Sequence, residues 1–414
     1  MKRISLLLFL VLNVSTLIAQ EDTKPKVSAS VYGFVRTDFW YENRQAAEAV
    51  EGLFTLYPLD RKLDASGFDL NEKPNANLLA LSTRLGTVIK GPEWLGAQTS
   101  MHIEGDFTGT SSTSGVRLRH ANMQFKWEKS QLLVGRFWHP MFLLQAFPTV
   151  MALNTGAPFN TFNRSPQLRL THHLSSSFTI IGAAVYQSDY ISPGPDKKEG
   201  SYLRNATTPE VVVQLHWHGK RLSSGVGAEW KQIQPFTSTI GQSGQTFKAD
   251  ERLKSYALQA YLKYKTDKFE WKIATIQGQN LYEYLMLGGY AIRSEDIVTG
   301  NKEYTPLQQA TYWTNLIYGD QFRIGVFAGY AQNNGTRDEI SNTGGTLYAR
   351  GDNIAEMYRI APWTAYSYNG FQLSAEYEYN SVAFGTVDLS DKAKVKDTHR
   401  VHSSRALLTL TYFF

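Results

Sequence analysis

The C-terminal residues alternate in polarity and end on a phenylalanine. Every second position from Ala406 to Phe414 is apolar, whereas Arg405, Thr409 and Thr411 lie on the other face. A period of two suits a strand with lipid on one side and water on the other. The pattern predicts the closing strand of an outer membrane β-barrel, with Phe414 at the periplasmic rim. The last strand of a soluble β-sandwich is the alternative.

The N-terminus has the three parts of a secretory signal peptide. Lys2 and Arg3 precede an apolar run at residues 4–14, and Ala19 offers a small residue for cleavage before Gln20. The segment that follows is too short for the plug domain of an energised receptor. The expected organisation is a signal peptide at 1–19, a short periplasmic segment at 20–30 and one barrel domain at 31–414.

Beyond the signal, no run of about 18 apolar residues occurs, which excludes a helical membrane protein. An exported chain that spans a membrane must then form a closed barrel, because only closure pairs every backbone group within lipid. Aromatic residues reach 13% while the apolar total is 42%, as expected where only alternate residues face lipid. The chain has no cysteine, which excludes thiolate metal sites, and its net charge of +5 is too small to indicate nucleic acid binding.

Alternating runs bounded by turn residues predict sixteen strands. Connections after even-numbered strands are tight, whereas those after odd-numbered strands are mostly long and polar. This segregation is typical of an outer membrane barrel with both termini in the periplasm. The predicted strands are 31–41, 78–89, 95–107, 116–127, 130–137, 166–174, 176–187, 209–218, 222–233, 254–265, 268–278, 309–318, 321–331, 355–367, 370–382 and 401–413.

Charged residues occupy one face of several predicted strands. In the third strand, Glu104 and Asp106 lie on the face opposite Met101 and Ile103. Because lipid does not solvate carboxylates, the charged faces must line the lumen. A polar lumen at this strand number is wide enough to hold water, which predicts a porin-type channel.

The third long connection, residues 138–165, is richer in apolar residues than an exposed loop should be. It contains Phe142, Phe147 and Phe162. Such a loop needs a surface to pack against, so we expect it to fold inward against the barrel wall and narrow the pore. An apolar subunit contact outside the barrel is the alternative.

Basic residues cluster in the first six predicted strands and at the end of this loop. Arginine stays charged and binds carboxylates through two hydrogen bonds, so it suits an anion path. We predict a positive wall opposite a negative one, although cross-strand ion pairs that neutralise each other are the alternative. The predicted pore-lining residues are Arg36, Asp38, Arg84, Glu104, Asp106, Arg117, Arg119, Arg136, Arg164 and Arg169.

The fourth predicted strand does not alternate cleanly. Arg117 and Arg119 share a face with Ala121, whereas His120 and Asn122 share the other. Both faces cannot point outward, so we predict a β-bulge between Arg119 and Ala121 that leaves both arginines and Asn122 in the lumen. Otherwise a polar outer face lies in a subunit interface.

Several short motifs within residues 31–175 point to one family. They are Gly33-Phe34-Val35-Arg36-Thr37-Asp38, Thr83-Arg84-Leu85-Gly86, Glu104-Gly105-Asp106-Phe107, Arg117-Leu118-Arg119-His120-Ala121, Gly135-Arg136-Phe137-Trp138 and Arg164-Ser165-Pro166-Gln167-Leu168-Arg169. On these motifs the chain resembles the DcaP-like family of trimeric porins. The resemblance implies a homotrimer in the outer membrane of a Gram-negative bacterium, with a positive constriction that favours small anionic solutes, including dicarboxylates. Arg136 and the long first loop, residues 42–77, depart from the family pattern and leave the solute open.

Passive diffusion is the function that these features favour, and it requires no enzyme chemistry, cofactor or metal. Stacked aromatic residues could instead form a sugar path, although aromatics in barrels more often form lipid girdles. That set is Tyr57, Trp138, Phe142, Phe147, Phe159 and Phe162. A barrel-embedded hydrolase is a third possibility, but no catalytic motif accompanies its candidate bases, which are His120, His139, His172 and His173.

Overall fold

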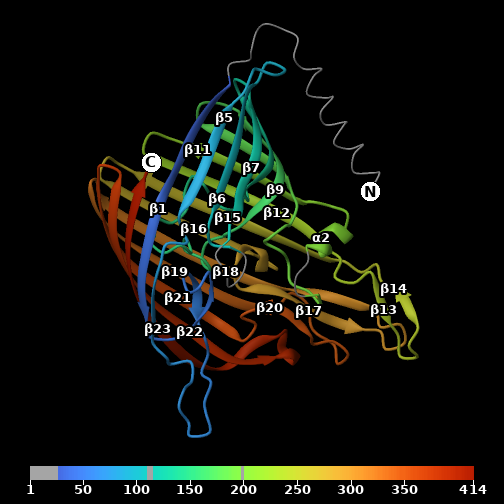
Figure 1. Ribbon diagram of the computed structural model, residues 1–414. Helices are drawn as coiled ribbons and strands as arrows, with labels where there is room; N and C mark the ends of the chain where they lie inside the picture. Colours follow the sequence, from blue (N-terminus) through green and yellow to red (C-terminus); the bar gives the residue numbers. More distant parts are fainter. Residues whose placement is uncertain (1–26, 110–114, 197–199) are drawn as a thin grey trace, which may run out of the picture.

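The first strand pairs with both ends of the sheet and thereby closes the wall into a cylinder. β1 (Ser28–Glu42) pairs with β23 (Lys394–Phe413) on one side, and with β4 (Asn75–Leu79) and β5 (Arg84–Lys90) on the other. The computed structural model, which describes residues 27–109, 115–196 and 200–414, is an all-β antiparallel barrel (Figure 1). The predicted signal peptide lies outside the described residues.

Sixteen strand positions follow one another around the described wall in chain order, with β4 and β5 sharing the second position. The remaining positions are β6 (Gln98–Asp106), β7 (Arg117–Lys126), β8 (Ser130–Trp138), β9 (Arg164–His173), β10 (Phe178–Val185), β11 (Glu210–His218), β12 (Leu222–Ile233), β15 (Leu253–Lys265), β16 (Phe269–Gln279), β18 (Lys302–Gly319), β19 (Phe322–Thr336), β21 (Ile354–Tyr368) and β22 (Phe371–Asp388). The predicted fold class is confirmed, and every predicted strand overlaps one of these.

Shorter elements lie in the connections between the wall strands. None of the helices among the described residues is long and apolar enough to cross a membrane. These elements are β2 (Ala46–Ala49), β3 (Phe54–Pro58), α2 (Ser201–Asn205), β13 (Ser238–Ile240), β14 (Thr246–Lys248), η1 (Tyr282–Tyr284), β17 (Gly288–Glu295), β20 (Leu347–Arg350) and η2 (Leu389–Asp391).

The two faces of the wall differ as the sequence predicts. In β23, Leu408 and Leu410 are 47% and 52% exposed, whereas Arg405, Thr409 and Thr411 are buried. The exposed apolar face suits contact with lipid, and the buried polar face lines the interior. The C-terminal strand is therefore oriented as its alternation predicts.

The predicted bulge in β7 is present, and its extra residue is Arg119. Glu104 of β6 pairs with His120, but the next residue, Gly105, pairs with Leu118. Arg119 and His120 are both buried, whereas Leu118 is 49% exposed on the outer face. The extra residue changes the parity of the strand, so two consecutive polar side chains enter the interior.

The third loop lies along the inner face of the wall. Its backbone binds polar side chains of five strands in turn, and each of these side chains is on the buried face. The contacts are Gln214 to Pro140, Gln259 to Met141, Lys263 to Gln145, Lys272 to Phe147, Asn315 to Thr149, and Glu376 to Met151 and Ala152.

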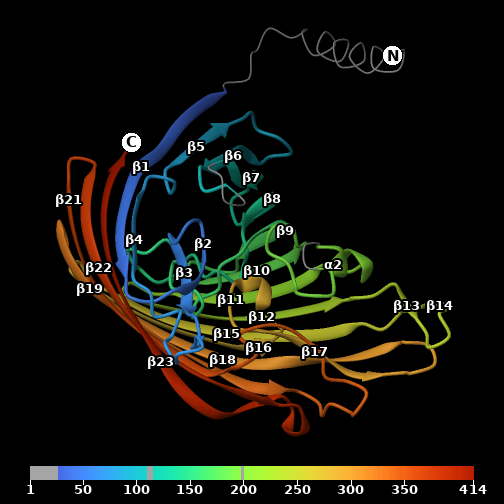
Figure 2. The same cartoon turned by 60° about the horizontal axis from the view of Figure 1, so that its bottom comes forward.

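The long first loop also enters the barrel, which the sequence did not indicate. β2 and β3 form a hairpin, and Figure 2 shows it within the ring of the wall. Arg359 of β21 donates to the carbonyl oxygens of Leu56 in β3 and Ala157 in the third loop, at 2.8 and 3.0 Å. One wall side chain therefore holds both loops, and together the loops narrow the lumen.

Candidate functional site

A cavity of about 580 Å³ lies where the two inserted loops meet the first part of the wall. We call it the constriction cavity. The β2–β3 hairpin, β7 and the third loop contribute to it, and so do the second, fourth and sixth loops, which follow β6, β10 and β16. Its lining includes Glu48, Ala49, Val50, Glu51, Phe54, Thr108, Arg117, Arg119, Leu153, Phe162, Asp189, Tyr190 and Leu285.

Arg117 and Arg119 share two carboxylates of β6. Arg117 donates to both oxygens of Asp106, at 3.2 and 2.8 Å, and Arg119 donates to Asp106 at 2.8 Å and to Glu104 at 2.6 Å. The hydroxyl of Tyr32 donates to the second oxygen of Glu104. The Arg119 side chain is 1% exposed and that of Arg117 is 20% exposed. Arg117 is therefore the member of the pair that offers more of its guanidinium to a solute.

A second ion pair ties the first strand to the third loop. Arg36 donates to Asp38 and to the carbonyl oxygen of Met151, at 2.5 and 2.6 Å. Ser82 donates to the other oxygen of Asp38 at 2.7 Å. This arginine positions the loop, and Asp38 balances its charge.

Three of the predicted arginines have no carboxylate within 4 Å among the residues that the structure describes: Arg84, Arg164 and Arg169. Arg164 is fully buried, with its guanidinium carbon 5.0 Å from the Trp138 ring centroid, and it donates to the Tyr190 hydroxyl at 2.8 Å. Arg84 lies over an aromatic ring in the same way, and so does Arg169. Aromatic faces stabilise these cations without cancelling their charge.

Arg136 binds the fourth loop and not the acids of β6. Its guanidinium pairs with Asp189 and donates to the Ser188 hydroxyl at 3.2 Å. Burial opposes ionisation of Asp189, but the hydrogen bond and charge of Arg136 hold the pKa of that carboxyl below its usual range. Arg136 is thus neutralised at the edge of the constriction cavity.

The structure brings the ten predicted residues into one region but changes the expected layout. Asp38, Glu104 and Asp106 lie among the arginines and pair with them, so they do not form an opposing negative wall. With Asp189 included, seven guanidinium groups meet four carboxylates here. The wall keeps an excess of positive charge, while the first loop adds the carboxylates of Glu48 and Glu51 to the constriction cavity.

The aromatic residues of a sugar path pack mainly against one another. Trp138 and Phe142 stack with ring centroids 4.0 Å apart, and Phe142 and Phe147 stack at 5.5 Å. Phe159 packs on Phe327 of the wall. Their faces are largely occupied, so the set does not form a continuous open track for sugar rings.

The candidate histidine bases have separate partners. The amide of Met141 donates to Nδ1 of His139, which leaves the proton of a neutral ring on Nε2, facing Glu210 at 3.2 Å. A different histidine, His120, packs among aromatic rings. His172 contacts Ser130 and His173 contacts Thr179, at 2.8 and 3.0 Å. They do not converge on one catalytic constellation.

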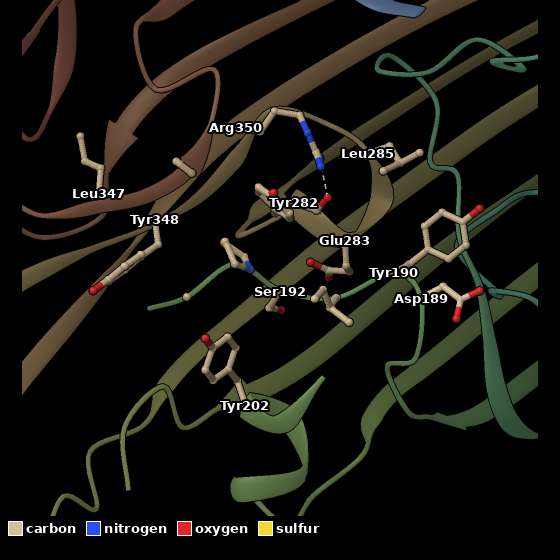
Figure 3. Close-up of a pocket in the computed structure, with 14 residues that line it drawn as sticks. Asp189, Tyr190, Ser192, Tyr202, Tyr282, Glu283, Leu285, Leu347, Tyr348 and Arg350 are labelled. Atoms are coloured by element: carbon tan, nitrogen blue, oxygen red, sulfur yellow. Dashed lines mark hydrogen bonds between the residues drawn. The ribbon is translucent and has the colours of Figure 1, made fainter. Parts of the chain in front are cut away.

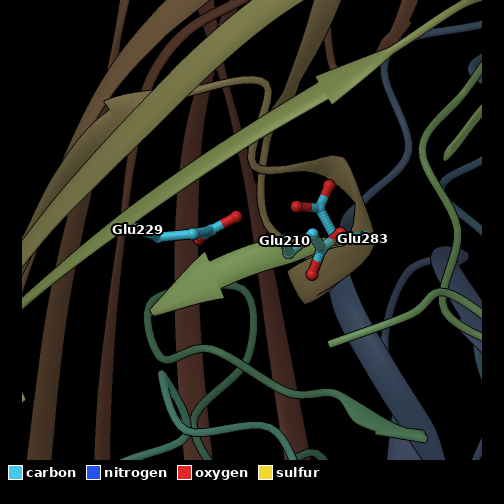
Figure 4. A group of neighbouring side chains, drawn as sticks. All are labelled: Glu210, Glu229 and Glu283. Atoms are coloured by element: carbon cyan, nitrogen blue, oxygen red, sulfur yellow. The ribbon is translucent and has the colours of Figure 1, made fainter. Parts of the chain in front are cut away.

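A buried acidic cluster joins the sixth loop to the wall. One oxygen from each of Glu210, Glu229 and Glu283 lies within 4.8 Å of the others (Figure 4). Carboxylate oxygens suit a divalent cation, but here the Lys231 ammonium lies 3.3 Å from Glu229 and also contacts Glu283. The Tyr284 hydroxyl donates to Glu229 at 2.5 Å. The cluster holds η1 against β12, with lysine as its resident cation.

Sequence reasoning missed this cluster because its members are far apart in the chain. The available signal was the pair Glu229 and Lys231, which lie on the inner face of one strand, with Glu283 in a loop that contains several apolar residues. Nothing in the spacing showed that this loop turns inward. The cluster therefore depends on where the sixth loop lies, which strand register alone does not determine.

A second cavity of about 520 Å³, which we call the vestibule, is shown in Figure 3. The fourth and sixth loops and β20 line it, and Arg350 of β20 donates to the carbonyl oxygen of Tyr282 at 2.7 Å. Asp189, Tyr190 and Leu285 line both cavities. The two spaces therefore adjoin and can form successive parts of one solute path.

Comparisons with solved structures identify this fold. The outer membrane channel DcaP of Acinetobacter baumannii matches with a TM-score of 0.67 and 17% identity, over 94% of this chain and 97% of that one. OmpT of Vibrio cholerae matches at 0.56 and 10% identity, over 95% and 99%. OmpT in its trimer form matches at 0.56 and 10% identity, over 94% and 99%. No family model and no curated protein sequence matches the chain. The chain thus has the porin fold.

Proposed function

We propose that this protein is a passive diffusion channel for small hydrophilic solutes and that it favours anions. The observation that carries the proposal is the excess of guanidinium groups over carboxylates in the first six wall positions, where Arg117 and Arg119 line the constriction cavity. A fixed positive potential in a narrow, low-dielectric passage raises the local concentration of anions and lowers that of cations. Dicarboxylates fit this charge, and their carboxylates match the hydrogen-bond geometry of arginine.

The proposed location is the outer membrane of a Gram-negative bacterium, reached after removal of the signal peptide. The apolar outer face of the wall supports contact with outer membrane lipids. The porin fold supports the same location. A homotrimer is the proposed assembly, because a solved relative in fold is described in a trimer form.

A sugar channel is a weaker candidate because the rings of the proposed track stack on one another. A hydrolase is weaker still, because the candidate histidines have separate partners among the residues that the structure describes. Neither hydrolysis nor sugar stacking explains the concentration of arginines in the first six wall positions.

Planar bilayer recordings test the proposal directly. The reversal potential in a KCl gradient gives the ratio of anion to cation permeability, and we expect it to exceed unity. Arg117→Gln should lower the ratio, because Arg117 is the partly exposed arginine of the cavity. The matched control is Arg221→Gln, which removes the same charge from an exposed turn after β11. A cation preference in the unaltered protein, or the absence of channel currents, would refute the proposal.

A further inference from the structure

The tip of the β2–β3 hairpin carries two acidic residues into the barrel. Glu48 and Glu51 line the constriction cavity, and both are exposed. Three successive residues of the turn have positive φ: Val50 at 58°, Glu51 at 51° and Gly52 at 82°. This left-handed backbone is costly for residues other than glycine, so the surrounding structure must hold it in place.

Packing fixes the hairpin tip within the lumen. Leu53 is buried, and the Phe54 ring lies 5.0 Å from that of Phe162 in the third loop. Gly52 sits so close to Trp40 of β1 that an added Cβ would lie 2.6 Å from the indole ring. The backbone that carries the two carboxylates is therefore held at a defined place in the lumen.

The carboxylates of the hairpin tip form no ion pair with the described residues. Among the residues that the structure describes, neither Glu48 nor Glu51 has a basic group within 4 Å. Arg117, which lines the same cavity, already has both oxygens of Asp106 as partners. The cavity thus presents the partly exposed Arg117 on β7 and a separate negative tip on the hairpin.

We propose that the constriction cavity selects small zwitterions, which bind with their carboxylate toward Arg117 and their ammonium group toward Glu48 and Glu51. This inference rests on the proposed channel function and names a substrate class for it. A zwitterion gains attraction at both ends, whereas an anion gains it only from Arg117 and a cation only from the hairpin tip. Separated charges of opposite sign therefore orient a dipolar solute across the pore.

Matched four-carbon solutes test this inference on the full-length protein in proteoliposomes. Swelling rates are compared for 4-aminobutyrate, which is zwitterionic, and 1,4-butanediol, which is neutral and of similar length. We expect 4-aminobutyrate to enter about tenfold faster, at the low end of electrostatic rate effects. The variant Glu48→Gln with Glu51→Gln should abolish this advantage and raise the anion to cation permeability ratio in bilayers.

The matched control is Glu93→Gln with Glu128→Gln, which removes two negative charges from exposed periplasmic turns. This control should leave the relative swelling rates and the anion to cation permeability ratio unchanged. An anion-selective channel that admits both solutes at equal rates would overturn the inference but leave the proposed function standing. A zwitterion advantage that survives in the Glu48 and Glu51 variant would also overturn it. Absence of any channel would overturn both.

Discussion

Arg119 is expected to hold the constriction together through its charge. Its side chain is 1% exposed, and it donates to Glu104 and Asp106 at 2.6 and 2.8 Å. The substitution Arg119→Met keeps an extended apolar side chain near Trp138, which lies 5.8 Å from the guanidinium carbon, but removes the charge. Asp106 keeps Arg117 as a partner, so the carboxylate that loses most is Glu104.

The size of the effect follows from burial. Removing one partner of a buried ion pair costs about 3–5 kcal/mol, because the remaining charge stays in a poor solvent. Glu104 retains the Tyr32 hydroxyl at 3.0 Å, so we expect a loss of about 3 kcal/mol in the free energy of unfolding. Adding Glu104→Gln to the methionine variant should restore most of this loss, since a neutral amide no longer requires a cation.

Urea unfolding of the refolded barrel, followed by tryptophan fluorescence, measures both variants and the Glu104→Gln single change in one cycle. A coupling free energy of about 2–3 kcal/mol is expected for groups in direct contact. Arg61→Met, in an exposed part of the first loop, controls for loss of an arginine. If the single and double variants unfold at the same urea concentration, the buried pairing does not stabilise the bulge.

Three further predictions concern the wall and its loops. Deleting Arg119 should leave the sixteen strands intact, with Arg117 still paired to Asp106, because Leu118 and His120 already pair with consecutive residues of β6. A shifted disulfide cross-linking pattern between β6 and β7 would contradict this. Lys231→Met should destabilise the barrel by about 3–5 kcal/mol, because it leaves buried carboxylates without their cation. Adding Glu283→Gln should partly reverse the loss. An unchanged unfolding midpoint in Lys231→Met would argue against lysine as the cation that stabilises the cluster. Asp189 has a lowered pKa, so its ion pair with Arg136 is present above about pH 4 and is lost as the pH falls through the pKa of the folded protein. Anion selectivity in bilayers should therefore rise below that pH, and Asp189→Asn should raise it at neutral pH. Equal selectivity of the unaltered channel at acidic and neutral pH would contradict this.

Strand positions were predictable because lipid imposes a strict alternation. Leu408 and Thr409 illustrate it: one faces outward and its neighbour is buried, as their sequence indicates. The bulge at Arg119 was predictable for the same reason, since a break in alternation has few structural solutions. β22 and β23 extend further than predicted, to Asp388 and from Lys394, where polar residues on both faces hide the period.

The inner surface was less predictable because loops, and not the wall alone, build it. The aromatic residues of the third loop predict that this loop is buried, whereas nothing in the first loop predicts the same. The acidic tip of the first loop, at Glu48 and Glu51, supplies the negative side of the constriction cavity. The strand face of Asp106 predicts a position opposite the arginines, yet Asp106 lies beside them. Alternation tells which face a residue occupies, but not which neighbour it meets.

The third loop has a consequence for the order of assembly. Its amides at Met151 and Ala152 bind Glu376, which lies 225 and 224 residues further along the chain. Contacts at such separation form late, because most of the chain must first be in place. A barrel that has not yet received β22 lacks the anchor for Met151 and Ala152, so this end of the loop would leave a wider and less selective opening. Selectivity is then acquired only as the cylinder is completed.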